Sequence, residues 1–451
     1  MSTTPDFINE REGRVPVAAR ADLVVVGGGP AGISAAVAGA RNGLSVILLE
    51  RYAYLGGLAS GGMVLVLDDM CNGPEISVRG LCGEMIDRME RLGLCVVPPE
   101  GERLSDETLW RKWSRWGVFD FHSHVKPQPI CYAAAFDPDG YKRAANDMVR
   151  EAGITLRLHS WFSRAIVEGG RIAGVICDTK SGRQAVMGSI VVDATGDLDV
   201  AASAGAPFSE GSFIVTTVFR LGGVDTEAAE RFEYEEPEAF AALDREAKKI
   251  MGGSWDKWWL KTPLPGIVWC NCPHMAGFDG LKVEDLTRAD FVGRDRITAL
   301  LTFVRAKMPG FENAFVIDVA PQIGVRQTRL LEGVYVMTKE DVTQRRHFAD
   351  TVARGRDYYY PYRSLLPRDV SQLIVAGRHY SATSSAQRIS REIPPCMAMG
   401  EAAGVAAALA LDAGVTIDRV DVAALQARLR AQGADPGDRP AQNALVAVAA
   451  E

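Results

Sequence analysis

The chain has 451 residues, which is enough for two or three domains. Hydrophobic residues make up 47% and charged residues 24% of the sequence, which excludes a disordered or fibrous protein. The formal net charge of −7 argues against a nucleic-acid-binding protein, because such proteins usually carry a basic face.

The first 20 residues contain acidic side chains and no apolar run, unlike a secretory signal. The apolar run over 400–415 is shorter than the roughly 20 residues of a membrane span and carries two acidic residues. The eight cysteines are scattered, which favours reduced thiols in a chain of this length. We therefore expect a cytoplasmic protein without a membrane span.

The first predicted elements form a strand–helix–strand unit. Residues 23–26 are apolar, β-branched at three positions and followed by glycines, which predicts a buried parallel strand. Residues 30–42 are rich in alanine and end before Gly43, which predicts a helix. A second apolar run over 45–49 completes a unit of about 30 residues, the size of a βαβ crossover.

The turn between this first strand and the helix carries a glycine pattern. Residues 27–32 read Gly-Gly-Gly-Pro-Ala-Gly and fit G-x-G-x-x-G, and Glu50 ends the second strand. In this context the pattern is typical of dinucleotide binding. The glycines permit a tight turn and close approach to a pyrophosphate, the helix N-terminus favours phosphates, and the carboxylate accepts ribose hydroxyls. The alternative is a strand–helix turn without a ligand. The residues expected to bind are Gly27, Gly29, Pro30, Ala31, Gly32 and Glu50.

Three further segments favour FAD over NAD as the ligand. Glycine pairs in 55–57 and 60–62 follow Glu50, and they suit a chain that passes close to a flat ring system. The sequence Asp-Ala-Thr-Gly-Asp over 193–197 ends a later strand, and Val-Ala-Gly-Arg over 375–378 precedes a helix whose N-terminus can face a flavin. The further residues expected to contact FAD are Arg51, Gly56, Gly57, Leu58, Ala194, Thr195, Gly196, Asp197, Gly377 and Arg378.

With these segments the sequence resembles the glutathione-reductase-type flavoproteins. Within them it is similar to the FAD-dependent oxidoreductase family that includes heterodisulfide reductase A-like proteins. Residues 361–367 (Pro-Tyr-Arg-Ser-Leu-Leu-Pro) and 399–404 (Met-Gly-Glu-Ala-Ala-Gly) also carry the resemblance, which covers about residues 20–410. It implies one non-covalently bound FAD and hydride chemistry, but no particular substrate. The chain lacks the C-x-x-C runs of the heterodisulfide reductase A-like proteins, so no iron–sulfur cluster is expected.

The remaining pattern predicts an α/β fold in which the FAD-binding domain is discontinuous. A helix is expected over 140–152, a strand over 154–159, an antiparallel meander over 161–186, strands over 189–192 and 372–376, and a helix over 396–411. The expected architecture is a Rossmann-like domain with a parallel sheet and a meander, and an inserted α+β substrate domain. The expected boundaries are an N-terminal tail over 1–20, the FAD-binding domain over 21–67, 136–210 and 365–430, the substrate or cap domain over 68–135 and 211–364, and a C-terminal tail over 431–451.

Candidates for the chemistry gather in the C-terminal half. His379 follows Gly377-Arg378, and a histidine can accept a proton at neutral pH. Alternatively, it only hydrogen-bonds the backbone or the cofactor. The many arginines between Arg326 and Arg391 predict either a clamp on a substrate anion or structural ion pairs. The residues predicted to be catalytic are Tyr362, Arg363, His379 and Arg391.

Three other groups favour structural roles. Trp110, Trp113 and Trp116 recur at helical spacing, which is more typical of a core than of a stacking wall for a substrate. Neither Cys270-x-Cys272-x-His274 nor His122-x-His124 has the usual spacing of zinc ligands, so we expect no metal site. Cys71 has no partner nearby in the sequence, which predicts a buried thiol rather than a redox disulfide.

The sequence therefore predicts an FAD-dependent dehydrogenase or reductase. It would transfer a hydride between a small organic substrate and the flavin, with an external electron acceptor. The alternatives are a flavin-dependent monooxygenase and a flavin-binding electron-transfer subunit without its own substrate. Among partners we expect no nucleic acid, and we allow for a homodimer.

Overall fold

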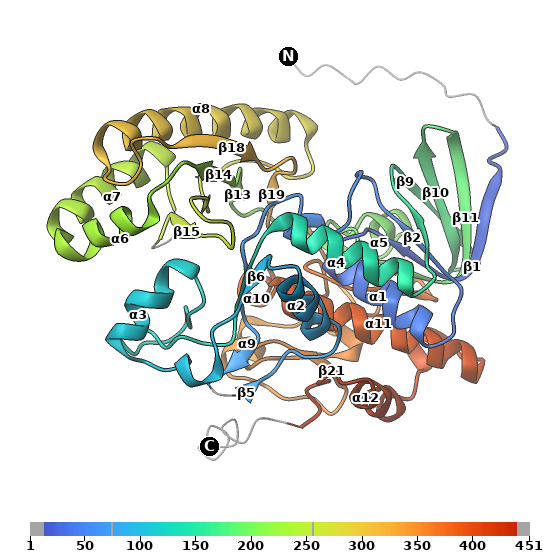
Figure 1. Ribbon diagram of the computed structural model, residues 1–451. Helices are drawn as coiled ribbons and strands as arrows, with labels where there is room; N and C mark the ends of the chain where they lie inside the picture. The colour runs from blue at the N-terminus through green and yellow to red at the C-terminus, as the bar shows by residue number, and fades with distance from the viewer. Residues whose placement is uncertain (1–12, 74, 255–256, 440–451) are drawn as a thin grey trace.

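The computed structural model describes residues 13–73, 75–254 and 257–439. Within this part, the chain is built around one seven-stranded sheet, in which β8–β2–β1–β11–β10–β9 are neighbours and β23 also pairs with β11 (Figure 1). The strands β1, β2, β8, β11 and β23 are parallel, and β9 and β10 are antiparallel to their neighbours. The bounds are β1 (Val17–Val26), β2 (Val46–Leu49), β8 (Thr155–Arg157), β9 (Trp161–Glu168), β10 (Arg171–Thr179), β11 (Gly182–Asp193) and β23 (Leu373–Val375).

This sheet confirms the predicted fold class. A turn at Gly169-Gly170 separates β9 from β10 as expected, and the next turn lies at Lys180-Ser181, one residue earlier than the predicted pair Ser181-Gly182. The predicted strand over 189–192 is not separate, because it continues β11 without a break.

Both faces of the parallel sheet are covered. Leu23 and Val25 pack in the same core as α1 (Pro30–Arg41), α4 (Pro138–Glu151) and α11 (Ile393–Ala413). Val24 and Val26 point to the opposite face and pack with residues of β10 and of α5 (Asp199–Ser203). Burial on both faces explains why the strand is a continuous apolar run rather than an alternating one.

The helix α11 packs directly on α1, and glycines let the two backbones approach. A Cβ atom at Gly400 would lie 2.0 Å from the carbonyl oxygen of Ala31, and one at Gly404 would lie 2.3 Å from that of Ala35. With 21 residues, α11 is longer than predicted. By length and by its mean hydropathy of 1.4 it could cross a membrane, but 72% of that apolar stretch is buried within the protein, as in a central core helix.

Glu401 is the buried carboxyl of α11. It accepts a hydrogen bond of 3.0 Å from the backbone N–H of Leu81, at the start of α2 (Leu81–Arg91). Burial raises the pKa of Glu401 from 4.5 to about 7, against the opposing effects of this hydrogen bond and of Arg41.

This raised pKa predicts a pH-dependent stability. The folded protein binds a proton at Glu401 more tightly than the unfolded chain does. Its contribution is therefore fully present below pH 4.5 and is lost as the pH rises to about 7, by about 3 kcal/mol at most. Glu401→Gln keeps an acceptor for Leu81 and should lack this loss. Urea unfolding on both sides of this pH window checks it. Equal pH dependence in the two proteins would show that Glu401 does not titrate there.

A second lobe lies at the opposite end of the molecule from the meander (Figure 1). Its largest core joins α6, α7 and α8 to a four-stranded sheet in the order β15–β16–β14–β18. The bounds are β14 (Phe219–Gly222), α6 (Thr226–Glu235), α7 (Pro237–Met251), β15 (Trp259–Lys261), β16 (Val268–Cys270), α8 (Val283–Lys307) and β18 (Phe315–Val319). The other elements are β3 (Val66–Leu67), β4 (Cys71–Asn72), β5 (Glu75–Ile76), β6 (Cys95–Val96), α3 (Glu107–Trp113), β7 (Ala134–Phe136), β12 (Phe208–Glu210), β13 (Val215–Thr216), β17 (His274–Met275), β19 (Gly324–Val325), β20 (Arg329–Leu331), α9 (Lys339–Thr343), β21 (Thr351–Arg354), β22 (Tyr359–Pro361), α10 (Ser384–Gln387) and α12 (Val422–Ala431).

The structure corrects several predicted boundaries. The strand β1 begins at Val17 and so includes the end of the expected N-terminal tail. Both α2 and the β21–β22 hairpin, which were expected in the cap, pack in the core of α1 and α11. Residues 432–439 are not a free tail, because Asp435 pairs with Arg354 at 3.0 Å. The end of that predicted tail, 440–451, lies outside the described residues.

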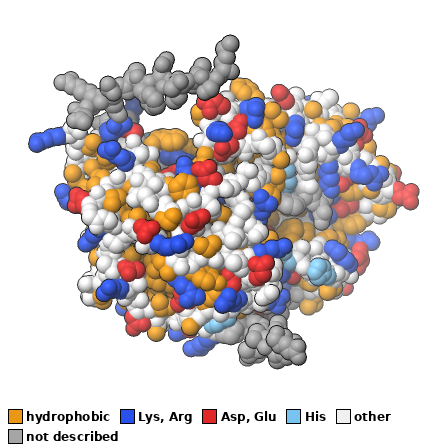
Figure 2. Space-filling view, turned by 180° about the vertical axis from the view of Figure 1, so that it is seen from behind, with side chains coloured by type: hydrophobic (Ala, Val, Ile, Leu, Met, Phe, Trp, Pro, Cys, Tyr) orange, Lys and Arg blue, Asp and Glu red, His pale blue; other side chains and the backbone are white. Residues whose placement is uncertain are grey.

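The surface carries both signs of charge. On the face shown in Figure 2, basic and acidic side chains are interspersed rather than gathered by sign. That face therefore shows no basic patch of the kind that binds nucleic acid.

Candidate cofactor site

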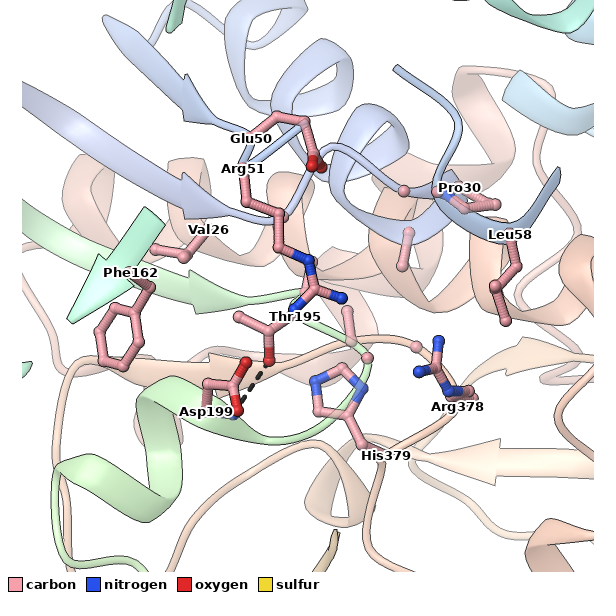
Figure 3. A pocket seen from close by; sticks show the side chains of 18 of the residues that line it. Val26, Pro30, Glu50, Arg51, Leu58, Phe162, Thr195, Asp199, Arg378 and His379 are labelled. Atoms are coloured by element: carbon pink, nitrogen blue, oxygen red, sulfur yellow. Dashed lines mark hydrogen bonds between the residues drawn. The ribbon is translucent and has the colours of Figure 1, made fainter. Parts of the chain in front are cut away.

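A cavity of about 710 Å³ opens at the carboxyl ends of the parallel strands. Val26, Leu49 and Ala376 line it where β1, β2 and β23 end, and residues 194–196 line it after β11. Ligands of open α/β sheets bind at this edge. The predicted residues that line the cavity are Gly27, Gly29, Pro30, Ala31, Glu50, Arg51, Gly57, Leu58, Ala194, Thr195, Gly196, Gly377, Arg378, His379 and Arg391, and Figure 3 shows several of them.

The three glycines of the G-x-G-x-x-G pattern have different roles. Gly27 has a φ of +106°, and a Cβ atom there would lie 2.3 Å from the carbonyl oxygen of Ala194. A Cβ at Gly32 would lie 1.8 Å from the carbonyl oxygen of Gly27, so Gly32 serves the close packing of the helix and does not line the cavity. A Cβ at Gly29 would meet nothing closer than the Cα of Gly57 at 3.9 Å. Gly29 therefore leaves free the space that a pyrophosphate needs.

Two helices begin at this cavity. Pro30 and Ala31 of α1 line it, and so do Glu392 and Ile393 at the start of α11. Neither helix has a side-chain cap on its first N–H groups. Both N-termini can therefore favour negatively charged groups of a ligand.

Glu50 lies at the rim where the ribose was expected. Its Oε2 accepts a hydrogen bond of 2.6 Å from the N–H of Gly28, and its Oε1 accepts one of 2.8 Å from the N–H of Tyr52. Burial raises the pKa of Glu50, although these hydrogen bonds and the charge of Arg51 act in the opposite direction. The two backbone donors fix the carboxyl so that its remaining lone pairs can accept hydroxyls.

Two aromatic residues near Glu50 were not among the expected site residues. Trp161 and Phe162 line the cavity at the start of β9, just beyond the carboxyl end of β8. The guanidinium of Arg51 lies over the rings of Tyr52 and Trp161, at 5.0 and 5.7 Å from their centroids. The predicted strand over 154–159 was the available signal, because residues that follow a parallel strand lie at the same sheet edge.

His379 belongs to a buried network. Its Nε2 lies 3.1 Å from the carbonyl oxygen of Asp193 and 3.2 Å from Oδ1 of the same residue. Asp193 also accepts from the N–H and the hydroxyl of Thr195 and from the N–H of Ala201. Burial raises the pKa of Asp193, but His379 and these hydrogen bonds lower it more. The network joins the loop after β23 to the loop after β11.

Asp197 holds the arginines of the site without lining the cavity. It accepts from Arg378 at 2.9 Å and from the hydroxyl of Thr328 at 2.8 Å, and it lies 3.9 Å from Arg51. Burial raises the pKa of Asp197, but the charges of Arg378 and Arg51 act in the opposite direction. The net effect lowers the pKa below its usual value, which favours the ionised carboxylate. Figure 3 shows Arg51 and Arg378 reaching toward the space around His379 from two loops.

Besides Gly32 and Asp197, three further predicted residues do not line the cavity. Gly56 has a φ of +110° and turns the chain beside Ser60 and Tyr141. The hydroxyl of Tyr362 is buried and donates to the carbonyl oxygen of Ile417 at 2.6 Å. Arg363 stacks on Tyr335 and Phe348 and lies 3.4 Å from Asp350. These contacts hold both side chains away from the cavity lining, and the catalytic roles of Tyr362 and Arg363 stay predictions.

The tryptophans at helical spacing form a core, as expected. Trp110 and Trp116 pack with buried Trp113 in a cluster that also contains Phe119, and none of them lines the cavity. Among the described residues, no group of three or more His, Cys, Asp and Glu side chains could hold a metal ion. Cys71 does have a neighbouring thiol, because Cys131 hydrogen-bonds to it and lowers its pKa.

The cavity offers polar atoms that a ligand can satisfy. Four residues that line it each have a buried side-chain atom without a hydrogen-bond partner among the described residues. These atoms are Nε of Arg378, Nδ1 of His379, Nε of Arg391 and Oε1 of Gln322. Buried polar groups without partners are rare in folded proteins and are typical of ligand sites. Together with two helix N-termini and the ribose-binding carboxyl of Glu50, the free nitrogens of Arg378 and His379 fit FAD.

Comparison with known proteins identifies the family. A family model described as FAD dependent oxidoreductase matches residues 22–360 and 354–429. No curated protein matches the sequence.

Several solved structures share the general fold at low identity. A geranylgeranyl bacteriochlorophyll reductase-like protein from Thermoplasma acidophilum is 12% identical over 92% of this chain and 84% of its own, with a TM-score of 0.45. A myxobacterial chondrochloren halogenase is 15% identical over 91% and 79%, with a TM-score of 0.48. A flavoprotein/dehydrogenase from Cytophaga hutchinsonii is 12% identical over 90% and 82%, with a TM-score of 0.48.

The family model spans most of the chain and includes every strand end that lines the cavity. The chain therefore belongs to the family of FAD-dependent oxidoreductases, and FAD is its cofactor.

Proposed function

We propose that this protein is a dehydrogenase or reductase that transfers a hydride between a small organic substrate and FAD, and that an external partner exchanges the electrons. The observation that carries the proposal is that residues outside the nucleotide-binding unit reach the cavity. Gln322, between β18 and β19, lines the cavity. Its backbone N–H donates to the carbonyl oxygen of Gly61 at 3.1 Å. A cavity that residues of the expected cap segment also line suits a substrate bound against the cofactor more than electron transfer alone.

Bound FAD supplies the acceptance or donation of a hydride. The protein's own contribution is to hold charge and to exclude water. The N-terminus of α11 and the guanidinium of Arg391 lie together at the cavity and stabilise negative charge there. His379 is only 1% exposed and is held by Asp193, which favours a role in holding the cofactor over direct proton transfer with a substrate.

Within the family, this chain lacks the C-x-x-C runs of the heterodisulfide reductase A-like proteins. The described residues contain no group of ligands for a metal centre. We therefore propose FAD as the redox group through which this chain acts on its substrate.

Anaerobic reduction of the purified holoenzyme tests the proposal. A substrate of this class should bleach the oxidised flavin spectrum in the absence of oxygen, or should reoxidise the dithionite-reduced enzyme. Turnover that requires oxygen and yields a hydroxylated product would instead assign a monooxygenase. Redox exchange with a stable partner protein but with no small molecule would assign an electron-transfer subunit.

A further inference from the structure

Arg391 is a largely buried guanidinium at the cavity. Its side chain is 13% exposed, and its Nε has no hydrogen-bond partner among the described residues. The carboxylate paired with it belongs to the adjacent Glu392, at a long distance of 3.8 Å. A desolvated guanidinium is costly unless an anion or several acceptors satisfy it. Arg391 is therefore poised to take a further acceptor from the cavity.

A second guanidinium lies close to Arg391. Nη2 of Arg326 lies 3.2 Å from the hydroxyl of Thr216 and 3.3 Å from Nε2 of His274. Burial lowers the pKa of Arg326 to about 10, and the positive charge of Arg391 contributes. Burial, helped by Arg326, lowers the pKa of His274 to about 3, so His274 stays neutral. The two arginines repel each other, and an anion between them and the cavity would relieve that repulsion.

Arg326 is tied to the cavity wall through the backbone. One side-chain nitrogen of Gln387 donates to the carbonyl oxygens of both Arg326 and Arg378, each at 3.0 Å. Gln387 is fully buried. The backbone of Arg326 is therefore fixed beside the segment that carries Arg378, and Arg326 lies behind the residues that line the cavity.

Two carboxyl groups interact with these arginines, and the charge of Glu392 raises the pKa of Arg326. Burial raises the pKa of Asp68 well above its usual value, and the charges of Glu392 and Asp69 raise it further, while the charge of Arg391 acts in the opposite direction. Asp68 thus holds its proton over a wider pH range than a free aspartate. Glu392 is 35% exposed and carries the negative charge beside Arg391.

We infer that the substrate of this enzyme carries a carboxylate, and that Arg391 binds it with Arg326 as the supporting charge. The planar guanidinium fits a carboxylate through two parallel N–H···O bonds, and the Nε of Arg391 is one donor of such a pair. This inference rests on the proposed function, since it places the substrate in the same cavity as FAD. It names the chemical class of the substrate.

Binding to the oxidised holoenzyme tests the inference without turnover. Acetate, propionate and benzoate are titrated against acetamide, propionamide and benzamide, and binding is followed by the flavin spectrum and by calorimetry. At least one acid should bind saturably and at least tenfold more tightly than its amide. Equal affinities, or binding by no acid, would overturn the inference.

Two variants locate the site. Arg391→Gln should retain FAD and bind the acid at least tenfold more weakly. The matched control is Arg363→Gln, because Arg363 stacks on aromatic rings outside the cavity, and it should bind the acid as the unmodified protein does. Loss of FAD from Arg391→Gln would assign Arg391 to the cofactor and would contradict the inference.

The outcomes separate this inference from the proposed function. A protein that binds acids through Arg391 but exchanges no hydride with any of them supports the carboxylate site and contradicts the dehydrogenase. A protein that is reduced by neutral substrates and does not prefer acids over amides supports the dehydrogenase and contradicts the carboxylate site.

Discussion

Gly29→Ala should yield a folded protein that has lost its FAD. Gly29 precedes α1 with φ −77° and ψ −176°, which is extended backbone that alanine adopts without strain. A Cβ atom there meets no protein atom closer than 3.9 Å. The added methyl group instead occupies the space in which the backbone approaches the pyrophosphate. We expect FAD affinity to fall at least about tenfold, which is about 1.4 kcal/mol.

Gly32→Ala is the contrasting variant, three residues later in the same motif. Its Cβ atom would lie 1.8 Å from the carbonyl oxygen of Gly27, so the start of α1 must move. This variant should lose stability even without FAD. Urea unfolding of the apoproteins and the flavin content of the purified proteins distinguish the two effects. An FAD-loaded Gly29→Ala protein of normal affinity would show that the phosphates bind elsewhere.

The cofactor site could be predicted because its residues follow strands. Glu50, Ala194 and Gly377 come from distant parts of the sequence, but each lies just beyond the end of a short apolar run. Parallel strands bring these ends to one edge of the sheet, so local patterns were enough to place them together. The same reasoning extends to Trp161, which follows β8 and lines the cavity although it was not expected there.

The motif over 361–367 did not show which of its side chains reach the cavity, because a motif does not give the direction of a side chain. Tyr362 and Arg363 lie in the motif over 361–367, which carried the family resemblance. Their partners are Ile417 and Asp350, and neither contact can be recognised from local sequence. The packing of α2 could not be predicted for a similar reason, since its apolar side chains pack on α1 and α11 from a segment expected in the cap.

The proximity of the Cys71 and Cys131 thiols could not be predicted from local sequence either. Cys71 and Cys131 are far apart in sequence, but β3 pairs with β7 in a register that sets Val66 opposite Ala135 and Leu67 opposite Ala134. This antiparallel pairing brings the segment that follows β3 toward the segment that precedes β7. The short strands β3 and β7 have no clear periodic pattern, so the pairing could not be predicted.

Gly400→Ala should destabilise the whole protein and weaken FAD binding together. Its Cβ atom would lie 2.0 Å from the backbone oxygen of Ala31, so the two central helices must separate. Overpacking of this kind costs about 1–3 kcal/mol, or more where backbone is involved. Ala31 lies in the first turn of α1 and lines the cavity, so the same displacement moves the phosphate-binding end of the helix.

A glycine in another helix of the same core provides the control. Gly83 of α2 has open space around its Cβ position, with nothing within 4 Å. Gly83→Ala should therefore leave stability unchanged or raise it by up to about 1 kcal/mol, because alanine favours helix more than glycine does. Thermal unfolding of the holoenzymes, combined with FAD titration of the apoproteins, measures both effects. If Gly400→Ala were as stable as Gly83→Ala, the contact between α1 and α11 would be looser than the structure shows. If Gly400→Ala lost stability but bound FAD normally, the position of α1 would not depend on this contact.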